Sequence, residues 1–323
     1  MKTMCSEIRE LDNGTQINSC FCVKYRHPPR EYANGFMFEI GLADKSGEVE
    51  LTYWGGRNAE AVQAMYDSFN TDDIVYVSGT VGAFREKKKI DVNERTGEIR
   101  PANPEEYQLD DFLHKTNQDV EEMWGNLIEI KESLDNPHLK GLLDAFFGDN
   151  VFVANFKKAP AAMYIHHACI GGLLEHTWEV LRYCEAAADV HPSLDKPLLF
   201  TGAILHDVGK IREYDVSMSI KQSKQGMLLG HTHIGTDLVL EKISGLPTFP
   251  PLLKDKLIHM ILSHHGKNEY GAAQEPELPE AATLHYADEM GAKITQYIRA
   301  KKDAATDDFR SKWNKYIGSV FLE

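Results

Sequence analysis

Apolar and polar residues alternate along the first part of the chain, from about residue 10 to residue 95, with the two-residue period of β-strands. The segments 35–44 and 47–54 show this alternation most clearly, and the turn-forming residues DKSG separate them. Two further strands and one short helix are expected at 72–84, 88–94 and 59–69, respectively. Short strands with one intervening helix predict a small Greek-key barrel of the oligonucleotide/oligosaccharide-binding (OB) type, with an SH3-like barrel or a β-sandwich as alternatives.

The pattern changes after residue 95. The segment TGEIRPANPEEYQLDD (96–111) has two prolines, many charges and no apolar period, which predicts a linker. Beyond it, apolar residues recur every three or four positions, first in 119–134 and 138–149 and then towards residue 323, which predicts helices. The sequence therefore predicts a multidomain α+β protein. Its expected parts are a small OB-type β-barrel over 1–98, a linker over 99–118 and a larger all-α domain over 119–323.

The composition is that of a soluble globular protein, with 42% hydrophobic and 26% charged residues in a chain of 323. No apolar run reaches membrane-spanning length, and the start MKTMCSEIRE has no signal-peptide core, so no membrane partner is expected. The five cysteines form no CxxC pair, which argues against a disulfide framework or zinc ribbon and favours a reducing cytoplasm. The net charge of −14 argues against bulk attraction to nucleic acid, although a local basic patch remains compatible with phosphate binding.

The stretch LLFTGAILHDVGKIREY (198–214) carries His206 and Asp207 at the end of an apolar helix. Gly209 follows, and we expect it to close the helix in a left-handed conformation. Burying an unpaired carboxylate is costly, so Asp207 needs a positively charged partner. A metal ion would supply this charge. A His–Asp pair that caps the helix is the alternative, and the stretch itself does not distinguish the two.

Histidines gather in one part of the chain. Of the 14, 11 fall between His166 and His285, where an even scatter would place about five. Those at or near the ends of apolar helices are His176, His206, His231, His264 and His265. Taken singly, each is more often a hydrogen-bonded core or cap residue. Together with Asp207 and Asp288 they predict a metal site, because imidazole and carboxylate ligands suit Mn, Fe, Co, Ni or Zn.

The series H…HD…H…HH…D, with HDVGK at its centre, resembles the HD superfamily of metal-dependent phosphohydrolases. Four segments, APAAMYIHHACIGGLLEHTWEV, LLGHTHIG, ILSHHG and LHYADEM, more closely resemble the YhaM family of 3′-to-5′ exoribonucleases. Members of that family join an N-terminal OB-fold to a C-terminal HD domain. The resemblance therefore implies the same order of domains over nearly the whole chain.

The resemblance also implies a site for two divalent transition-metal ions, with manganese expected and cobalt, iron, nickel or zinc as alternatives. The first ion would be held by His176, His206, Asp207 and Asp288, and the second by Asp207, His231, His264 and His265. Lys210 would contact the substrate phosphate, with a solvent-exposed lysine at a helix end as the alternative.

The remaining histidines of this region are expected to take lesser roles. His166 and His167 are expected either to bind a phosphate or the 3′-terminal nucleotide, or to cap the helix start at 171–172. His233 and His259 are expected to face away from the metals, because of their spacing from His231 and His264. His285, one turn before Asp288, is a candidate for support of the metal site from behind the ligands.

The β-barrel is expected to hold a single strand through stacking and basic side chains. The aromatic candidates are Phe21, Tyr53, Trp54, Tyr76 and Phe84, of which Trp54 lies on the strand face opposite Tyr53. The run FREKKK places Arg85, Lys87, Lys88 and Lys89 at a hairpin tip, within reach of phosphates. Aromatic residues in the barrel core with a solvated lysine turn are the alternative.

The resemblance implies a metal-dependent 3′-to-5′ exoribonuclease that hydrolyses single-stranded RNA to nucleoside 5′-monophosphates. An HD-type nucleotide or cyclic-nucleotide phosphohydrolase is one alternative, and an inactive nucleic-acid-binding adaptor is another. The sequence contains neither a GxSxG motif nor a GxxxxGK[ST] loop, so these motifs give no support to another hydrolase chemistry. The sequence leaves open the native metal, the choice between single-stranded RNA and DNA, and whether the chain forms a homo-oligomer.

Overall fold

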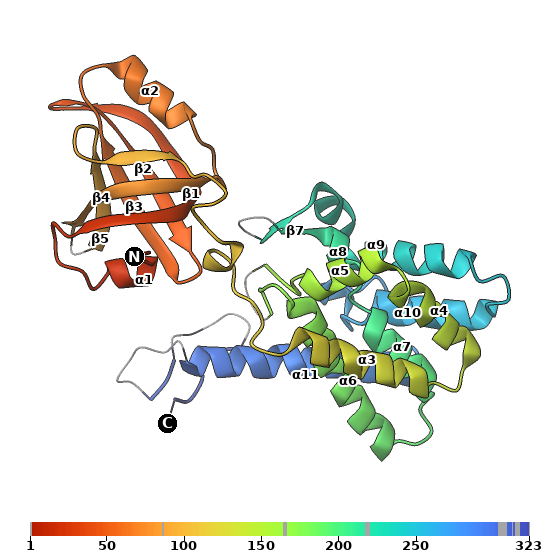
Figure 1. Cartoon of the computed structure of the whole chain (residues 1–323). Coiled ribbons are helices and arrows are strands. Elements are labelled where there is room, and N and C mark those ends of the chain that lie inside the picture. Colours follow the sequence, from red (N-terminus) through yellow and green to blue (C-terminus); the bar gives the residue numbers. More distant parts are fainter. Residues whose placement is uncertain are drawn as a thin grey trace. The chain divides into compact units, whose positions relative to one another are not determined.

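The computed structural model describes residues 2–85, 87–163, 167–216, 220–302, 309–311, 313 and 317–322. The chain divides into two compact units, of which the first ends at His114 and the second begins at Lys115. Figure 1 shows the strands of the first unit and the helices of the second. Each unit has its own apolar core, so each is described separately below.

The first unit is a closed five-stranded barrel with one added strand. Its strands are β1 (Gln16–Tyr32), β2 (Gly35–Asp44), β3 (Gly47–Trp54), β4 (Ile74–Phe84), β5 (Lys87–Asn93) and β6 (Glu98–Pro101). The barrel order is β1-β2-β3-β5-β4, and β1 also pairs with β4, which closes the ring. The β3–β5 pair is parallel and the other pairs are antiparallel. Strand β1 has irregular register between Val23 and Tyr25, which lets one long strand pair with β4 and then β2. This topology confirms the predicted OB barrel.

The barrel core contains the alternating apolar residues of β2 and β3. Phe38, Ile40, Leu42, Val49, Leu51 and Tyr53 are all buried. The short helices α1 (Cys5–Ile8) and α2 (Ala59–Asp67) contribute Ile8 and Val62 to the same core. The predicted linker is wrong at its start, because β6 pairs with β4. Further along, Phe112 packs on Cys20 and Ile74 beyond the 3₁₀ turn η1 (Leu109–Asp111).

The second unit is helical. Its helices are α3 (Val120–Ser133), α4 (Pro137–Phe147), α5 (Asn150–Lys158), α6 (Gly172–Val190), α7 (Lys196–Leu205), α8 (Lys210–Glu213), α9 (Lys224–Ser244), α10 (Pro251–Ser263) and α11 (Pro279–Lys302), with the 3₁₀ turn η2 (Asn268–Tyr270). A small hairpin of β7 (Tyr214–Val216) and β8 (Ile220–Gln222) interrupts the helices of the predicted all-α domain, which is otherwise confirmed. Among the described residues, no helix has the length and apolar character needed to cross a membrane.

Helix α7 is the central helix of this unit. Its start is fixed by Asp195, whose side chain accepts a hydrogen bond from the backbone N–H of Leu198. Every residue from Leu198 to Leu205 is buried, because neighbouring helices cover it on all sides. A helix with no solvent-exposed face delivers the residue after its end into the interior. His206 and Asp207 therefore enter the core of the unit.

Two glycines set how the chain enters and leaves this region. Gly230 has a φ of +69° and breaks α9 directly before His231, so a new helical segment opens at that histidine, as the sequence predicts. Gly209 does not take the predicted left-handed conformation, since its φ is −63° and its ψ is −21°. Its role is close packing instead. A Cβ at Gly209 would lie 2.0 Å from the carbonyl oxygen of His231, so only glycine lets α8 approach α9 this closely.

Candidate metal centre

The seven predicted metal ligands meet in one buried place in the helical unit. They come from α6, from the ends of α7 and α10, from α9 and from α11, and they are His176, His206, Asp207, His231, His264, His265 and Asp288. His206 is 0% exposed and Asp207 is 2% exposed. Residues this polar are not buried without partners, because desolvating them is costly. Their partners here are one another.

The two carboxylate oxygens of Asp207 face two different groups of histidines. Its Oδ2 atom lies 3.3 Å from Nε2 of His176 and 3.3 Å from Nε2 of His206. Its Oδ1 atom lies 3.4 Å from Nε2 of His231 and 3.6 Å from Nε2 of His264. A carboxylate placed in this way can bridge two metal ions, with one oxygen on each.

Each group gathers around one of these oxygens. In the first, Nε2 of His176 lies 3.3 Å from Nε2 of His206 and 3.1 Å from Oδ1 of Asp288. In the second, Nε2 of His231 lies 3.3 Å from Nε2 of His265, and the third member is His264. Ligand atoms about 2.1 Å from a common ion are separated by about 3.0 Å at right angles and about 3.4 Å in a tetrahedron. The observed separations match both arrangements.

Backbone carbonyls determine which ring nitrogen of two histidines carries the proton. The Nδ1 atom of His206 donates to the carbonyl oxygen of Ala203 at 2.9 Å. The Nδ1 atom of His264 donates to the carbonyl oxygen of Ile261 at 2.7 Å. A carbonyl oxygen can only accept, so Nδ1 carries the hydrogen in both rings. In the neutral rings, the Nε2 atom that faces Asp207 is then unprotonated, which is the form that binds a metal.

The donor set fits divalent transition metals. Two buried atoms that point into the centre, Oδ1 of Asp207 and Nε2 of His264, have no hydrogen-bond partner among the described residues. Buried polar atoms normally have such a partner, and a cation between the two groups would supply it. Imidazole nitrogens and carboxylate oxygens together are the ligands of Mn, Fe, Co, Ni and Zn.

The protonation of the two groups differs. Burial by itself would lower the pKa of His176, but the carboxylates of Asp207 and Asp288 outweigh it and raise this pKa to about 9. Burial lowers the pKa of His265 to about 4, and the nearby His231 adds to this effect. Burial also lowers the pKa of His264. Without metal, the first group therefore holds a proton at neutral pH, whereas His264 and His265 are neutral.

Lys210 is buried beside the bridging carboxylate. Its Nζ atom lies 2.5 Å from Oδ2 of Asp207, and the residue is 8% exposed. The alternative of a solvent-exposed lysine at a helix end is therefore wrong. Burial would raise the pKa of Asp207, but the charge of Lys210 and the contacts with His176 and His206 outweigh it and lower that pKa. Asp207 is thus an anion that the lysine neutralises in part.

His167 lies beside the centre, with its ring 5.7 Å from that of His176. Its Nδ1 atom lies 3.3 Å from a carboxylate oxygen of Glu175, and its Nε2 atom lies 3.1 Å from one of Glu179. Burial would lower the pKa of His167, but the two carboxylates raise it. Both ring nitrogens therefore have partners on α6. His166, the other half of the predicted pair, lies outside the described residues.

The remaining histidines behave largely as expected. His233 is exposed, and Nε2 of His259 accepts a hydrogen bond from the backbone of Glu277, so both lie away from the ligands. His285 supports the centre through His264, not through Asp288, which lies one turn after it in the sequence. Its Nδ1 atom donates to the carbonyl oxygen of His264 at 2.9 Å, and its ring packs against Gly266.

One carboxylate of the site has no counterpart in the sequence prediction. Glu213, the last residue of α8, is 5% exposed, and its Oε2 atom lies 3.1 Å from Nδ1 of His231. Its position six residues after Asp207 gives no periodic signal. The glutamates that hold His167 were missed for a related reason. A glutamate on an amphipathic helix such as α6 is expected from sequence to lie on the surface, because the sequence does not show that His167 packs against it.

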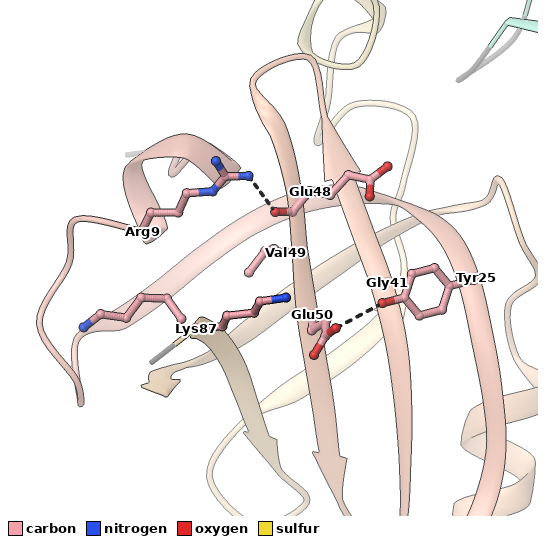
Figure 2. A pocket seen from close by; sticks show the side chains of 8 residues that line it. Arg9, Tyr25, Gly41, Glu48, Val49, Glu50 and Lys87 are labelled. Carbon is pink, nitrogen blue, oxygen red and sulfur yellow. Dashed lines mark hydrogen bonds between the residues drawn. The ribbon is translucent and has the colours of Figure 1, made fainter. Parts of the chain in front are cut away.

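The barrel carries two adjoining pockets on the outside of β1, β2, β3 and β5. The first has a volume of about 460 Å³ and is lined by Arg9, Tyr25, Gly41, Glu48, Val49, Glu50, Lys87 and Lys88. Figure 2 shows Tyr25 and Glu50 on its wall, joined by a contact between the hydroxyl and the carboxylate. The second, of about 420 Å³, shares these two residues and adds Trp54, Phe84 and Lys89 among others. Together they form a groove with aromatic and charged walls, which we call the barrel groove.

The aromatic candidates fall into three classes. Phe21 and Tyr53 are buried in the barrel core, and Tyr53 stacks on Phe38 with the ring centres 4.8 Å apart, so the prediction that they stack on bases is wrong. The guanidinium of Arg100 lies 4.5 Å from the centre of the Tyr76 ring. Trp54 and Phe84 line the barrel groove.

Trp54 is held in place by hydrogen bonding and charge. Its Nε1–H donates to Oδ1 of Asp91 at 2.7 Å, and Nζ of Lys89 lies 5.1 Å from the centre of its ring. Arg85 follows the end of β4 and is exposed, while Lys87 to Lys89 form the start of β5 rather than the turn itself. Lys88 is directed partly at the barrel, because its Nζ atom donates to the carbonyl oxygen of Leu11 at 2.7 Å.

Comparison with known proteins agrees with this division. Residues 30–100 match the family model described as an OB-fold nucleic acid binding domain, and residues 173–293 match the HD domain model. The fold and the histidine–aspartate centre thus define an HD-domain hydrolase that also carries an OB-fold.

Relatives are similar over nearly the full length. The chain is 32% identical to the 3′-5′ exoribonuclease YhaM of Bacillus velezensis over 95% of this chain and 92% of that protein. It is 33% identical to the protein of the same name in Bacillus subtilis, over 90% and 87%. With that of Listeria welshimeri it shares 29% identity over 87% and 86%. The chain belongs to the YhaM family of 3′-5′ exoribonucleases, which confirms the family and the enzyme class expected from the sequence.

Proposed function

We propose that this protein is a metal-dependent 3′-to-5′ exoribonuclease that removes nucleoside 5′-monophosphates from single-stranded RNA at a centre for two metal ions. The observation that carries the proposal is the position of Asp207, whose two oxygens face two separate groups of histidines. The names of the relatives support the choice of RNA and the direction of cleavage. The same residues would also suit a nucleotide phosphohydrolase, so the substrate has to be tested directly.

The proposed ligand sets are those in which the atoms lie together. His176, His206 and Asp288 would hold one ion, His231, His264 and His265 would hold the other, and Asp207 would be shared between them. We propose manganese as the metal, since a centre of imidazoles and carboxylates favours transition metals over magnesium. Two such ions would supply an acidified water molecule and positive charge for the attacking and leaving oxygens.

Lys210 is proposed to bind the phosphate that is cleaved. Its ammonium group lies at the centre and is paired with Oδ2 of Asp207. Ions on both sides of Asp207 would take over the neutralisation of that carboxylate. The lysine would then be available to a non-bridging phosphate oxygen, where negative charge grows as the phosphodiester bond breaks.

The barrel groove is proposed to hold the upstream part of the strand. Trp54, Phe84 and Tyr25 offer aromatic surface, and Tyr25 and Phe84 are 40% and 62% exposed. Bases stack on such rings without regard to sequence. We propose that Arg85, Lys87, Lys88 and Lys89, at the end of β4 and the start of β5, contact the phosphates.

The proposal is tested with a 5′-labelled single-stranded RNA, incubated with the full-length protein with and without MnCl₂. The expected result is a ladder of products that shorten from the 3′ end only when Mn²⁺ is present. Asp207→Asn should abolish the ladder, because the bridging ligand is weakened, whereas Asp237→Asn, on the exposed face of α9, should not. Full nuclease activity in a folded Asp207→Asn protein would refute the two-metal mechanism.

Two further outcomes would favour a different function. Intact RNA together with metal-dependent hydrolysis of free nucleotides or cyclic nucleotides would favour the small-molecule phosphohydrolase. Salt-sensitive RNA binding without hydrolysis of any phosphoester would favour the binding adaptor. Single-stranded DNA of the same sequence belongs in the same assay, because stacking and phosphate contacts do not by themselves separate the two polymers.

A further inference from the structure

The two groups of ligands differ in charge. The first contains a carboxylate of its own, Asp288, in addition to the shared Asp207. The second consists of three histidines, His231, His264 and His265, which bring no negative charge. Two divalent ions in similar surroundings would therefore be neutralised unequally. The second site would be the weaker one unless another anion lies close to it.

Glu213 is such an anion. Its side chain is buried, and its Oε2 atom lies 3.1 Å from Nδ1 of His231, on the side of the ring away from Asp207. Its Oε1 atom accepts a hydrogen bond from the side chain of Gln222 at 3.4 Å. A buried carboxylate is therefore held against one particular ligand.

The backbone around Glu213 is fixed on both sides. Its carbonyl oxygen accepts a hydrogen bond from the N–H of Ser223 at 2.8 Å, across the base of the β7–β8 hairpin. A Cβ at Gly226 would lie 2.4 Å from the same oxygen, so the first turn of α9 packs directly on this residue. Glu213 is thus held next to His231 by two features, the β7–β8 hairpin and Gly226 in the first turn of α9.

We propose that Glu213 is a positioning residue for the second metal ion. The Oε2 atom of Glu213 has no hydrogen-bond partner among the described residues and lies 3.1 Å from Nδ1 of His231. With a small turn of the ring it would accept the Nδ1–H, which would leave Nε2 unprotonated and directed at the ion. Glu213 also places a negative charge on the far side of the His231 ring from the second ion. The only other carboxylate in that ligand set, Asp207, is shared with the first ion. Carboxylates that support a metal-binding histidine in this way typically change metal affinity by about 10–100-fold. The inference rests on the proposed function, because it assumes that two ions bind.

Glu213 also accounts for a difference between the histidines. His206 and His264 donate from Nδ1 to neutral backbone carbonyls, whereas His231 faces a carboxylate. A carboxylate makes an imidazole a stronger electron donor than a carbonyl does. His231, which differs from His206 and His264 in this respect, belongs to the group that lacks its own carboxylate, so the arrangement balances the two sites.

The test compares Mn²⁺ binding to the full-length wild-type protein and to Glu213→Gln, starting from metal-free samples titrated with MnCl₂. Calorimetry gives the number of ions and their affinities, and electron paramagnetic resonance distinguishes a coupled Mn pair from an isolated ion. We expect two ions in the wild type. In Glu213→Gln, we expect one ion at unchanged affinity and a second bound about 10–100-fold more weakly, with loss of the coupled signal at limiting Mn²⁺.

Glu280→Gln is the matched control. Glu280 is also a buried glutamate of the helical unit, at 8% exposure, but its Oε1 atom accepts a hydrogen bond from the backbone N–H of Asp195, which is not a proposed ligand. Both variants are first checked for folding by thermal melting without metal. If Glu213→Gln does not fold, Glu213→Asp, which keeps the charge but shortens the reach, takes its place.

The outcomes separate the two proposals. Two ions in Glu213→Gln with wild-type affinities would overturn the role of Glu213 and leave the two-metal centre intact. Equal weakening of both ions would also overturn it, because the effect would then be structural. A wild type that binds only one ion would overturn the two-metal centre itself and this inference with it.

Discussion

The ammonium nitrogen of Lys210 lies 2.5 Å from Oδ2 of Asp207, the same oxygen that faces His176 and His206. A carboxylate oxygen so close to a lysine cannot at the same time bind a metal ion at full strength, since both cations compete for it. The pair places Lys210 within reach of a phosphate that would bind across the two proposed ions.

Lys210→Met should therefore separate metal binding from catalysis. With Mn²⁺ present, the proposed ions would neutralise Asp207, so the number of ions bound should stay the same. The loss of a positive charge near the reacting phosphate should lower kcat by about 100-fold or more. Metal counts by atomic absorption and single-turnover cleavage of labelled RNA check this. Wild-type kcat in Lys210→Met would mean that the lysine only stabilises the metal-free protein.

Gly209→Ala should weaken the second ion selectively. The added Cβ would lie 2.0 Å from the carbonyl oxygen of His231 and 2.6 Å from the backbone nitrogen of Gly235, so α9 must move away from α8. His231 moves with it, while the ligands on α6 and α11 keep their positions. Calorimetric titration with MnCl₂ should show one intact site and one weakened site. Gly125→Ala, at a half-buried position in the middle of α3 with nothing within 4 Å of its Cβ, is the control and should bind two ions.

Metal loading should release a proton at neutral pH. The pKa of His176 is raised to about 9, so in the metal-free protein this imidazole is protonated at pH 7, and an ion can bind only the neutral ring. The released proton should be seen as a difference in binding heat between buffers of different ionisation enthalpy. The difference should shrink as the pH rises through about 9. A heat that does not depend on the buffer at pH 7 would show that His176 is already neutral.

The same pKa has a consequence for stability. A histidine whose pKa is higher in the folded than in the unfolded protein stabilises the fold fully below its unfolded value, and this contribution disappears as the pH rises through the folded value. For His176 these limits are 6.5 and about 9. The metal-free protein should therefore lose stability over this range, whereas Mn²⁺-loaded protein should not lose it for this reason. Thermal melting at pH 6.5 and pH 9.5, with and without MnCl₂, measures the difference.

The sequence predicts the barrel and most of the metal centre because both depend on periodic or local signals. Buried alternation defines β2 and β3, and histidines at the ends of apolar helices mark residues that a core must accommodate. Gly209 was misjudged for a physical reason. A glycine after a helix is ordinarily a cap, and nothing local reveals that the backbone of His231, over twenty residues away, lies against it.

Glu213 and Tyr25 show what pattern analysis cannot reach. Their roles come from contacts between segments that are distant in the chain, Glu213 with His231 and Tyr25 with Gly41. The aromatic candidates were misjudged for the opposite reason. The alternation of apolar and polar residues predicts that each strand has two faces. It does not predict which aromatic rings are covered by another side chain, as Tyr53 is by Phe38 and Tyr76 is by Arg100.

Tyr25 is expected to be a base-stacking residue of the barrel groove. Its ring lies flat over Gly41, where a Cβ would come within 2.1 Å of the ring atom Cε1, so the absence of a side chain at position 41 lets the ring lie against β2. The hydroxyl contacts Glu50 at 3.5 Å, which holds the ring in this orientation, while 40% of the residue remains exposed. A flat, anchored and exposed ring beside Lys87 is what a stacked base requires.

Tyr25→Ala should weaken binding of single-stranded RNA by about 5–150-fold, since one base–aromatic stack is worth about 1–3 kcal/mol. Gly41→Ala should have an effect of the same sign, because the new Cβ pushes the ring off the strand. Tyr25→Phe should have a smaller effect than Tyr25→Ala, because the ring remains and only its contact with Glu50 is lost. Tyr76→Ala is the control, since the Arg100 guanidinium covers that ring. Fluorescence anisotropy in EDTA measures binding without cleavage, so the result does not depend on the metal centre. Wild-type affinity in Tyr25→Ala would place the strand elsewhere on the barrel.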